Sequence, residues 1–217
     1  MSEVLEENKK IDRELEAMFL AGVQFGYYRS KRQPKMSGYL YGIKNNVEVF
    51  DLEKTRDALR AAEDFLRQTG EAKRSVLWVG TKPSAKAAVV KIAKSLSHSH
   101  VSGRWVGGSL TNSKIIRDRI KYFEDLKKKN ETGELDKYTK KEKLKLMREI
   151  KALEEKFSGI ENLRSDLEAV IIVDPKEEKT AFSEAKKMGV PIIAILSSDN
   201  DPTGVAFPIP ANDSASS

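Results

Sequence analysis

Apolar residues recur in two rhythms along the chain. Three short runs are almost continuously apolar, and glycine, proline or aspartate bounds them: Ser75–Val79, Glu168–Val173 and Val190–Leu196. Apolar residues at helical spacing flank the first run, namely Ala58, Leu59, Ala62, Phe65 and Leu66 before it, and Ala85, Ala88, Val89, Ile92, Ala93 and Leu96 after it. A further helix is expected between Pro175 and Gly189. Apolar strands that alternate with helices predict an α/β fold, a doubly wound parallel sheet flanked by helices.

A different helical rhythm separates the two halves of this pattern. Apolar residues at spacings of three and four form two narrow seams: Ile116, Ile120 and Phe123, then Leu146, Ile150, Leu153 and Phe157. A polar link around Gly133 joins them, so we predict a projecting antiparallel helical hairpin packed as a coiled coil. The expected domains are therefore a sheet domain (1–113 and 157–213), the hairpin insertion (114–156) and a polar tail (214–217).

The first fifty residues are mixed in character. Ile11, Leu15, Met18 and Phe19 lie at helical spacing and predict an amphipathic helix. Residues 22–46 are rich in glycine, aromatic residues and cations, and Pro34 interrupts them, so this stretch is predicted to be a basic loop. Residues 47–52 alternate apolar and polar side chains, which is typical of a strand.

Charge is distributed unevenly. The chain carries 39 Lys+Arg against 33 Asp+Glu, for a net charge of +6. Residues 21–46 hold 5 basic residues and no acidic one, and residues 114–156 hold 15 basic against 10 acidic, while both ends are acidic. Such asymmetry favours a surface that faces a polyanion. Cysteine is absent, no apolar run approaches the length of a membrane helix, and the acidic N-terminus does not resemble a secretory signal. We expect a soluble, cytoplasmic protein.

Two stretches combine cations with features that suit RNA. Residues 27–36 interleave aromatic rings with four cations, and residues 102–112 join an Arg and a Trp to three glycines. Cations contact phosphates, exposed rings stack on unpaired bases, and glycine backbone allows a sugar-phosphate strand to approach closely. The alternative for the second stretch is a tight loop that buries Trp105 and lets Asn112 cap the following helix. The candidate RNA-binding residues are Tyr27, Tyr28, Arg29, Lys31, Arg32, Lys35, Arg104, Trp105, Gly107, Gly108, Thr111 and Asn112.

An enzyme is a second hypothesis. A doubly wound sheet binds ligands beyond the carboxyl ends of its strands, where Lys82 precedes a predicted helix N-terminus and where Asp174, Asp199 and Asp201 lie. No glycine-rich nucleotide-binding motif occurs, and turn chemistry explains the aspartates equally well. Pro83 and Ser84 are typical of a helix start and a helix cap.

Metal binding and a coiled-coil adaptor complete the alternatives. His98 and His100 are the only histidines and lie in a Ser-rich stretch, where we expect a solvated loop, because zinc would need further ligands and there is no cysteine. We therefore expect no metal or other cofactor. The hairpin, in turn, suits an adaptor that binds another protein.

Several motifs fall in an order that resembles one family. They are Ala21-Gly22-Val23-Gln24-Phe25-Gly26, Pro34-Lys35-Met36, Asp51-Leu52-Glu53-Lys54-Thr55, Val79-Gly80-Thr81-Lys82, Arg104-Trp105-Val106-Gly107-Gly108-Ser109-Leu110-Thr111-Asn112, Asp174-Pro175 and Pro208-Ile209-Pro210. The chain resembles the ribosomal protein S2 family in its bacterial form, from about Leu15 to Asp213. The resemblance implies a flavodoxin-like parallel sheet with a projecting helical hairpin.

The resemblance also implies a function and a set of contacts. Members of the family bind small-subunit ribosomal RNA near the junction of head and body, adjoin other small-subunit proteins and help to hold the messenger-binding protein S-one; they are not enzymes and have no membrane partner. It implies that Arg29, Lys31, Arg32 and Lys35 grip phosphates, as does Arg104 beside Gly107 and Gly108, with Lys82, Arg117, Lys121 and Lys128 as further candidates. Gln24 and Tyr27 stand where the family usually has His.

Overall fold

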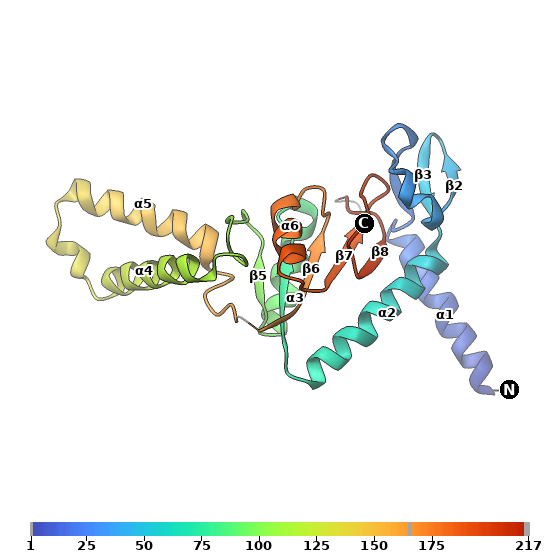
Figure 1. Cartoon of the computed structure of the whole chain (residues 1–217), viewed down its shortest axis with the longest axis horizontal. Coiled ribbons are helices and arrows are strands. Elements are labelled where there is room, and N and C mark those ends of the chain that lie inside the picture. The colour runs from blue at the N-terminus through green and yellow to red at the C-terminus, as the bar shows by residue number, and fades with distance from the viewer. Residues whose placement is uncertain (1, 165, 215–217) are drawn as a thin grey trace.

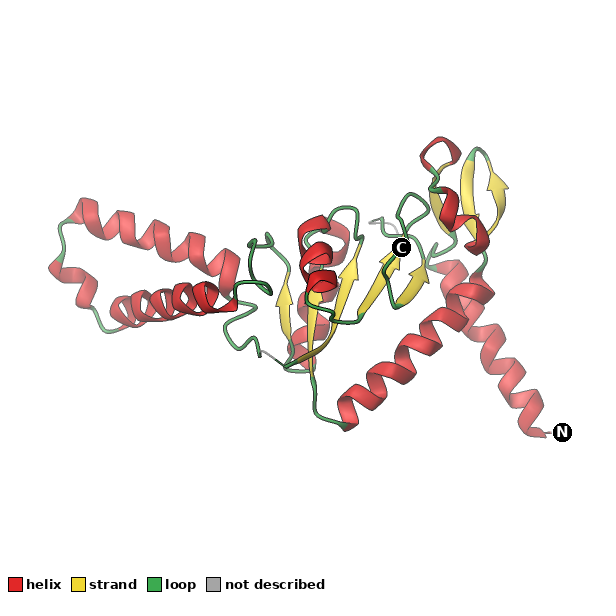
Figure 2. Ribbon diagram, viewed as in Figure 1, coloured by secondary structure: helices red, strands yellow, loops and turns green. Residues whose placement is uncertain are grey.

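The computed structural model describes residues 2–164 and 166–214, and Figures 1 and 2 show how its elements are arranged. Its α-helices are α1 (Ser2–Leu20), α2 (Leu52–Glu71), α3 (Pro83–Ser95), α4 (Ser113–Glu131), α5 (Lys140–Phe157) and α6 (Lys179–Lys187). Its strands are β1 (Phe25–Tyr28), β2 (Leu40–Lys44), β3 (Val47–Phe50), β4 (Ser75–Val79), β5 (Ser99–Val101), β6 (Leu167–Val173), β7 (Ile192–Leu196) and β8 (Phe207–Pro210). Short 3-10 helices are η1 (Arg29–Lys31), η2 (Pro34–Tyr39) and η3 (Glu134–Lys137).

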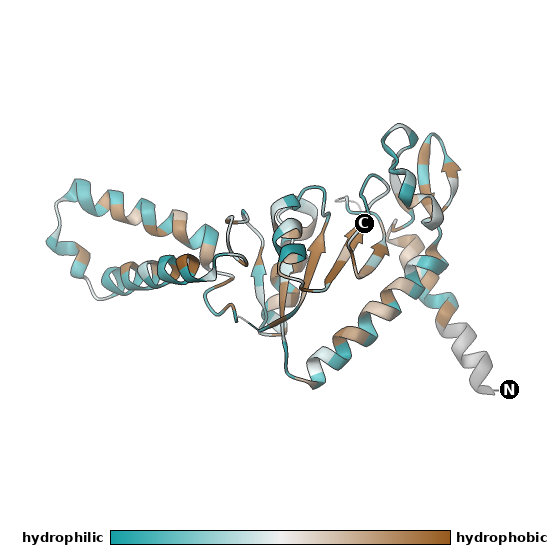
Figure 3. Cartoon of the chain, in the orientation of Figure 1, coloured by the Kyte–Doolittle hydropathy of each residue, from teal (hydrophilic) through white to brown (hydrophobic). Residues whose placement is uncertain are grey.

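A five-stranded parallel sheet forms the centre of the molecule. Its strand order is β5-β4-β6-β7-β8, and every neighbouring pair is parallel. The three inner strands are the three apolar runs of the sequence, and they form the brown centre of Figure 3. The predicted α/β fold is confirmed. The edge strands β5 and β8 were not predicted, because β5 is short and β8 contains two prolines, which only an edge strand tolerates well.

Helices cover both faces of this sheet. Alternate side chains of a strand point to opposite faces, so neighbouring residues of one strand join different cores. On one face, Ala62 of α2 packs with Val76, Ile171 and Ile193. On the other face, the small residues of α6 pack over the strands, in one core that includes Ala181, Ala185, Leu77, Val79, Val170, Ile172 and Ala194. The sheet is thereby fixed between two apolar layers, and its carboxyl edge is left to the loops.

The sequence suggested that residues 22–46 form one loop, but the structure shows that they do not. They contribute two strands to a three-stranded antiparallel sheet with the order β1-β3-β2. The turn between β2 and β3 consists of Asn45 and Asn46, whose φ angles of +51° and +64° are those of a tight hairpin turn. The many glycines and cations obscured this signal, because β1 and β2 lie mostly at the surface and bury few apolar side chains.

Helices α4 and α5 lie side by side and extend away from the sheet (Figure 1). The predicted seam of α4 is buried, and the last predicted residue of α5, Phe157, is buried too. Tyr122 Oη on α4 donates to Glu149 Oε1 on α5 across 3.1 Å. Helix α5 begins with a capping box, in which Thr139 and Glu142 satisfy each other's backbone amides. Teal residues cover the outer faces of both helices in Figure 3, as expected for solvent-facing surfaces.

Each end of the chain has a contact with a neighbouring element or residue. Helix α1 forms where amphipathic spacing predicts it, and Glu14 pairs with Arg60 of α2 at 3.0 Å. No helix in the described part of the chain is long and apolar enough to cross a membrane. Of the predicted tail 214–217, only Ser214 lies among the described residues, and its amide donates to Asn212 Oδ1.

Candidate nucleic-acid interface

The carboxyl edge of the parallel sheet gathers the loops that the sequence singled out. Lys82 follows β4, Asp174 follows β6, Ser198 follows β7 and Asp213 follows β8. Strand β4 connects through α3 to β5 on one side, while β6 lies on its other side, so the strand order reverses between β4 and β6. This is the place where a doubly wound sheet usually binds a ligand.

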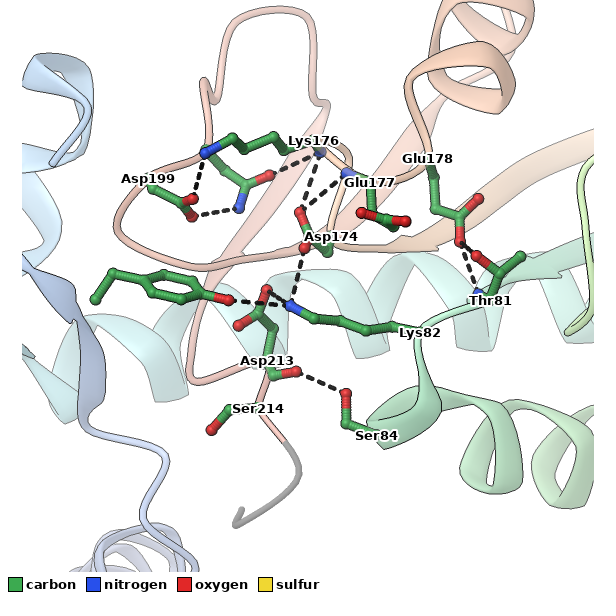
Figure 4. Close-up of polar contacts among 12 residues, drawn as sticks. Thr81, Lys82, Ser84, Asp174, Lys176, Glu177, Glu178, Asp199, Asp213 and Ser214 are labelled. Carbon is green, nitrogen blue, oxygen red and sulfur yellow. Dashed lines mark hydrogen bonds and ion pairs between the residues drawn. The ribbon is translucent and has the colours of Figure 1, made fainter. Parts of the chain in front are cut away.

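A charged cluster fills that place (Figure 4). Lys82 Nζ donates to Asp213 Oδ2 at 2.7 Å, to Asp174 Oδ2 at 3.0 Å and to Tyr27 Oη at 3.2 Å. The carboxylate side chains are 9% exposed for Asp174 and 1% exposed for Asp213, so they have left bulk water. Lys82, which the sequence suggested as a possible phosphate contact, is therefore already bound to two carboxylates.

The electrostatics of the cluster follow from burial and pairing. Burial alone lowers the pKa of Lys82, but its hydrogen bonds to Asp213 and Asp174 raise that pKa by more, so the ammonium is held charged. Burial raises the pKa of Asp174, yet the bond from Lys82 brings it below the ordinary value. Burial and the neighbouring Asp174 raise the pKa of Asp213. Lys82 thus holds together two carboxyl groups that differ in their readiness to take a proton.

The other aspartates at this edge are also paired. Lys176 Nζ lies 2.6 Å from Asp199 Oδ2, and Lys35 Nζ lies 3.0 Å from Asp201 Oδ2. Hydrogen bonds from Thr203 and Lys35 lower the pKa of Asp201 to about 2. Asp174, Asp199 and Asp201 therefore contact three different lysines, which is the arrangement of structural ion pairs.

Helix α3 begins at Pro83, as predicted, but Ser84 is not its cap. Ser84 Oγ donates instead to the backbone oxygen of Asp213 at 2.8 Å, and the residue before the helix, Lys82, makes no capping bond with its side chain. The hydroxyl thus ties the C-terminal segment to the start of α3. An apolar cavity of about 180 Å³ adjoins Ser84 and Asp213, below the roughly 300 Å³ of typical ligand pockets.

The first predicted RNA segment, residues 27–36, runs from the end of β1 through η1 into η2, and Ser198 at the end of β7 holds its backbone. The amide of Tyr27 donates to Ser198 Oγ at 2.8 Å, and the amide of Gln33 donates to Ser198 O at 2.9 Å. A Cβ on Gly26 would lie 2.7 Å from Ser198 Oγ, so only glycine allows this approach. Met36 is fully buried and anchors the end of the segment.

The side chains of this segment mostly face solvent. Its four cations, Arg29, Lys31, Arg32 and Lys35, are all exposed. Tyr28 is 57% exposed, whereas Tyr27 is half-buried beneath the ammonium of Lys31, which lies 5.4 Å from the ring centre. Arg32 lies 3.6 Å from the buried Glu48, so it and Lys35 have carboxylate partners. Arg29 and Lys31 have no ion pair within the described residues.

The second predicted segment, residues 102–112, wraps around a residue that sequence reasoning missed. Glu184 of α6 is 8% exposed. Its Oε1 accepts from Trp105 Nε1 at 3.0 Å and from the Gly108 amide at 2.7 Å. Its Oε2 accepts from the amides of Leu110 at 3.0 Å and Thr111 at 3.2 Å, and from Thr111 Oγ1 at 3.2 Å. The sequence did contain a signal for its burial, because Glu184 lies between Ala181 and Ala185 on the apolar side of a helix.

This arrangement decides where the predicted residues of the second segment lie. Trp105 is only 9% exposed and points its ring nitrogen inward, so the alternative of a buried tryptophan holds and the ring offers no stacking face. Arg104, Gly107, Thr111 and Asn112 are exposed, and Gly108 has a φ of +90° that favours glycine. Asn112 precedes α4 but makes no capping bond with its side chain.

The remaining candidates do not join these segments into one patch. Arg117, Lys121 and Lys128 are exposed on α4. Figure 1 places α4 and the three-stranded sheet on opposite sides of the parallel sheet. The predicted residues therefore form two groups, one around residues 27–35 and one that begins at Arg104 and continues along α4.

The histidines are structural rather than solvated. His98 Nδ1 accepts from Trp78 Nε1 at 3.2 Å, and His100 belongs to β5, where its amide donates to Gly159 O. Burial lowers the pKa of both imidazoles. Among residues 2–164 and 166–214, no group of three or more His, Asp or Glu side chains could hold a metal ion. The prediction of a solvated loop here was wrong, because β5 pairs with β4.

Comparison with known proteins agrees with the arrangement of motifs. The family model for ribosomal protein S2 matches residues 18–217. A small ribosomal subunit protein uS2c of Emiliania huxleyi is 41% identical over 90% of this chain and 85% of that protein. The uS2 protein of Buchnera aphidicola subsp. Cinara cedri is 41% identical over 91% of this chain and 82% of that protein. The uS2 protein of Coprothermobacter proteolyticus is 37% identical over 93% of this chain and 75% of that protein.

Proposed function

Because the chain belongs to the ribosomal protein S2 family, we propose that it is a structural component of the small ribosomal subunit and contacts ribosomal RNA with two exposed basic segments. The first comprises residues 27–35, and the second begins at Arg104 and continues along α4 through Arg117, Lys121 and Lys128. The proposed role is to bind and position RNA, in the translating ribosome, without chemical change to it.

The observation that carries the proposal is the first segment. It presents four exposed cations and the exposed ring of Tyr28, and no acidic residue lies within it. Ser198 clamps its backbone to the end of β7, so these side chains project from a fixed platform. Because the backbone is already held, only the side chains lose conformational freedom when the cations neutralise phosphates, and Tyr28 offers a face to an unpaired base.

The alternatives receive less support from the same geometry. The site where an enzyme of this fold would bind its substrate is filled by Lys82, Asp174 and Asp213, which form ion pairs with one another. Lys82 is therefore not among the proposed RNA contacts. Trp105 is not among them either, because its ring is buried. An adaptor role for α4 and α5 is compatible with the family, since the exposed faces of the two helices are free to meet RNA or protein.

Finer features of the family extend the proposal. We assign the sheet domain (1–113 and 157–213) to contact near the junction of head and body, and the inserted helices (114–156) to a separate unit. Neighbouring small-subunit proteins, among them the messenger-binding protein S-one, are the proposed protein partners. Cross-linking on purified subunits would map each of these contacts.

A triple substitution tests RNA binding directly. Arg29→Ala, Arg32→Ala and Arg104→Ala remove three cations that the structure leaves exposed. Removing three phosphate contacts should reduce the slope of log affinity against log salt by roughly 2 to 3 units, measured by fluorescence anisotropy with small-subunit ribosomal RNA.

A matched triple provides the control. Arg67, Lys91 and Lys187 are exposed cations of α2, α3 and α6, and their replacement by Ala changes the net charge equally. We expect this control to keep most of the wild-type slope. Equal losses in the two triples, or a wild-type slope of only about −1, would refute the proposed interface.

A further inference from the structure

The segment from Arg104 to Asn112 has an internal organiser. It contains no strand or helix, yet five of its donors converge on the carboxylate of Glu184: the ring nitrogen of Trp105, the amides of Gly108, Leu110 and Thr111, and the hydroxyl of Thr111. Buried backbone donors need acceptors, and the carbonyl groups of the loop accept from the amides of Ser109 and Asn112 but not from those of Gly108, Leu110 and Thr111. One side chain of α6 therefore replaces the hydrogen bonding that regular secondary structure would provide.

The charge of Glu184 is balanced by these donors and not by a cation. Burial raises the pKa of Glu184, but the bonds from Trp105, Gly108, Leu110 and Thr111 lower it by more, so the group stays ionised at neutral pH. Within the described residues Glu184 makes no ion pair. A buried carboxylate that accepts several amide bonds fixes the direction of each donor, because hydrogen bonds to a charged group are short and strong.

We propose that Glu184 is a positioning residue for RNA binding, which holds residues 104–112 in the shape that presents Arg104 and the exposed Gly107 backbone to ribosomal RNA. This inference rests on the proposed function. The donors that Glu184 collects face inward, while Arg104 and Gly107 stay exposed on the outside of the same turns. Further turn bonds, from the Ser109 amide to Val106 O and from the Asn112 amide to Gly108 O, complete the frame.

The substitution Glu184→Gln separates shape from charge. A glutamine has one oxygen and one NH₂ group, and each oxygen of Glu184 accepts from at least two donors. In either orientation the new NH₂ group faces two N–H groups, so part of the frame must open. By charge alone, loss of an anion should strengthen binding to RNA, whereas loss of the loop shape should weaken it. The two explanations predict opposite signs.

The test measures RNA affinity of the full chain by anisotropy. We expect Glu184→Gln to weaken binding about tenfold, whereas Glu177→Gln, an exposed carboxylate just before α6, should leave binding unchanged or slightly stronger. In a double-mutant cycle, Arg104→Ala should weaken binding about tenfold in the wild-type background and less than about threefold beside Glu184→Gln. Hydrogen exchange of the Gly108, Leu110 and Thr111 amides should accelerate in Glu184→Gln only.

The outcomes separate this inference from the proposed function. If Arg104→Ala weakens binding equally in both backgrounds, or if Glu184→Gln binds as tightly as Glu177→Gln, Glu184 does not position the segment and the proposed function stands. If Arg104→Ala has no effect in the wild-type background, the RNA contact of this segment fails and the inference falls with it. Should Glu184→Gln not fold, Trp105→Phe, which removes one donor, takes its place and should give a smaller loss in the same cycle.

Discussion

Lys82 and Glu184 are both ionised groups beside the parallel sheet, the first half-buried and the second buried, and they bind opposite kinds of partner. Lys82 binds two carboxylates with formal charge, whereas Glu184 binds neutral N–H and O–H donors. The first cluster joins side chains from three distant parts of the chain: Lys82 itself, Asp174 and Asp213. The second joins one side chain to the backbone of one loop.

The difference shows what each cluster can stabilise. Opposite charges bring chain segments together but place few demands on backbone shape, because a flexible lysine can adjust to its partners. Amide donors around one carboxylate fix the backbone itself, since each N–H must point at an oxygen. The Lys82 cluster therefore serves to close the switch point, and the Glu184 cluster serves to shape a surface loop.

The largest stability loss should come from the charge cluster. Lys82→Met leaves Asp174 and Asp213 buried without their cation, and we expect a loss of about 3 kcal/mol at pH 7 in urea denaturation. Without Lys82 the folded pKa of these carboxyl groups lies above the unfolded value near 3.9, so the variant gains stability as the pH falls toward that value. The loss should therefore shrink as the pH falls through the raised folded pKa of these carboxyl groups.

Lys35→Met is the control for this prediction. Its side chain is 56% exposed and pairs at the same edge of the sheet with Asp201, whose side chain is 43% exposed. Surface pairs contribute little, so a loss below about 1 kcal/mol is expected. Equal losses for the two lysine variants would show that burial does not distinguish the Lys82 cluster.

Glu184→Gln should cost less, about 2 kcal/mol at pH 7, because the loop can open and let water reach some of the freed donors. The folded pKa of Glu184 is lowered, so its contribution is complete above the unfolded value near 4.3 and is lost as the pH falls through the folded value. The difference between wild type and variant should stay constant from pH 7 to about 5 and close only below about 4. This profile contrasts with that of Lys82→Met.

Glu178→Gln is the matched control. Glu178 is also buried and accepts two bonds from Thr81, but burial raises its pKa above the ordinary value. A raised pKa means that the site disfavours the charged form relative to water, so a neutral amide should be tolerated with less loss than at Glu184. A larger loss at Glu178 would contradict the view that donor number decides the cost.

The contrast between the clusters also explains what the sequence could predict. The inner strands β4, β6 and β7 were predictable because burial on both faces leaves continuous apolar runs. Strands β1, β2, β5 and β8 were not, because their stability comes from pairing with neighbours that are distant in the sequence. Strand β3 was predicted from its alternating side chains, and the Asn45-Asn46 turn was a local signal that β2 pairs with it.

The same distinction holds for the candidate site. Exposed cations such as Arg29 and Arg104 were found because a surface residue needs no partner to be recognised. Lys82 was taken for a phosphate contact because Asp213 lies 131 positions away in the sequence, and Glu184 was missed because its donors precede it by more than seventy positions. Buried polar groups are defined by partners that only the fold brings together.

The smallest effect should come from Tyr27, which connects the Lys82 cluster to the first RNA segment. Tyr27→Phe removes the oxygen that accepts from Lys82 but keeps the ring that lies beneath Lys31. This hydrogen bond is long and partly exposed, and Lys82 keeps its two carboxylate partners, so we expect the free energy of unfolding to fall by only about 0.5 kcal/mol. RNA affinity should not change measurably if the Lys82 cluster takes no part in RNA binding. Anisotropy and urea denaturation of the same preparation measure both. A clear loss of affinity would show that the Lys82 cluster also sets the position of residues 27–35. The view that only the Glu184 cluster shapes an RNA-binding segment would then be wrong.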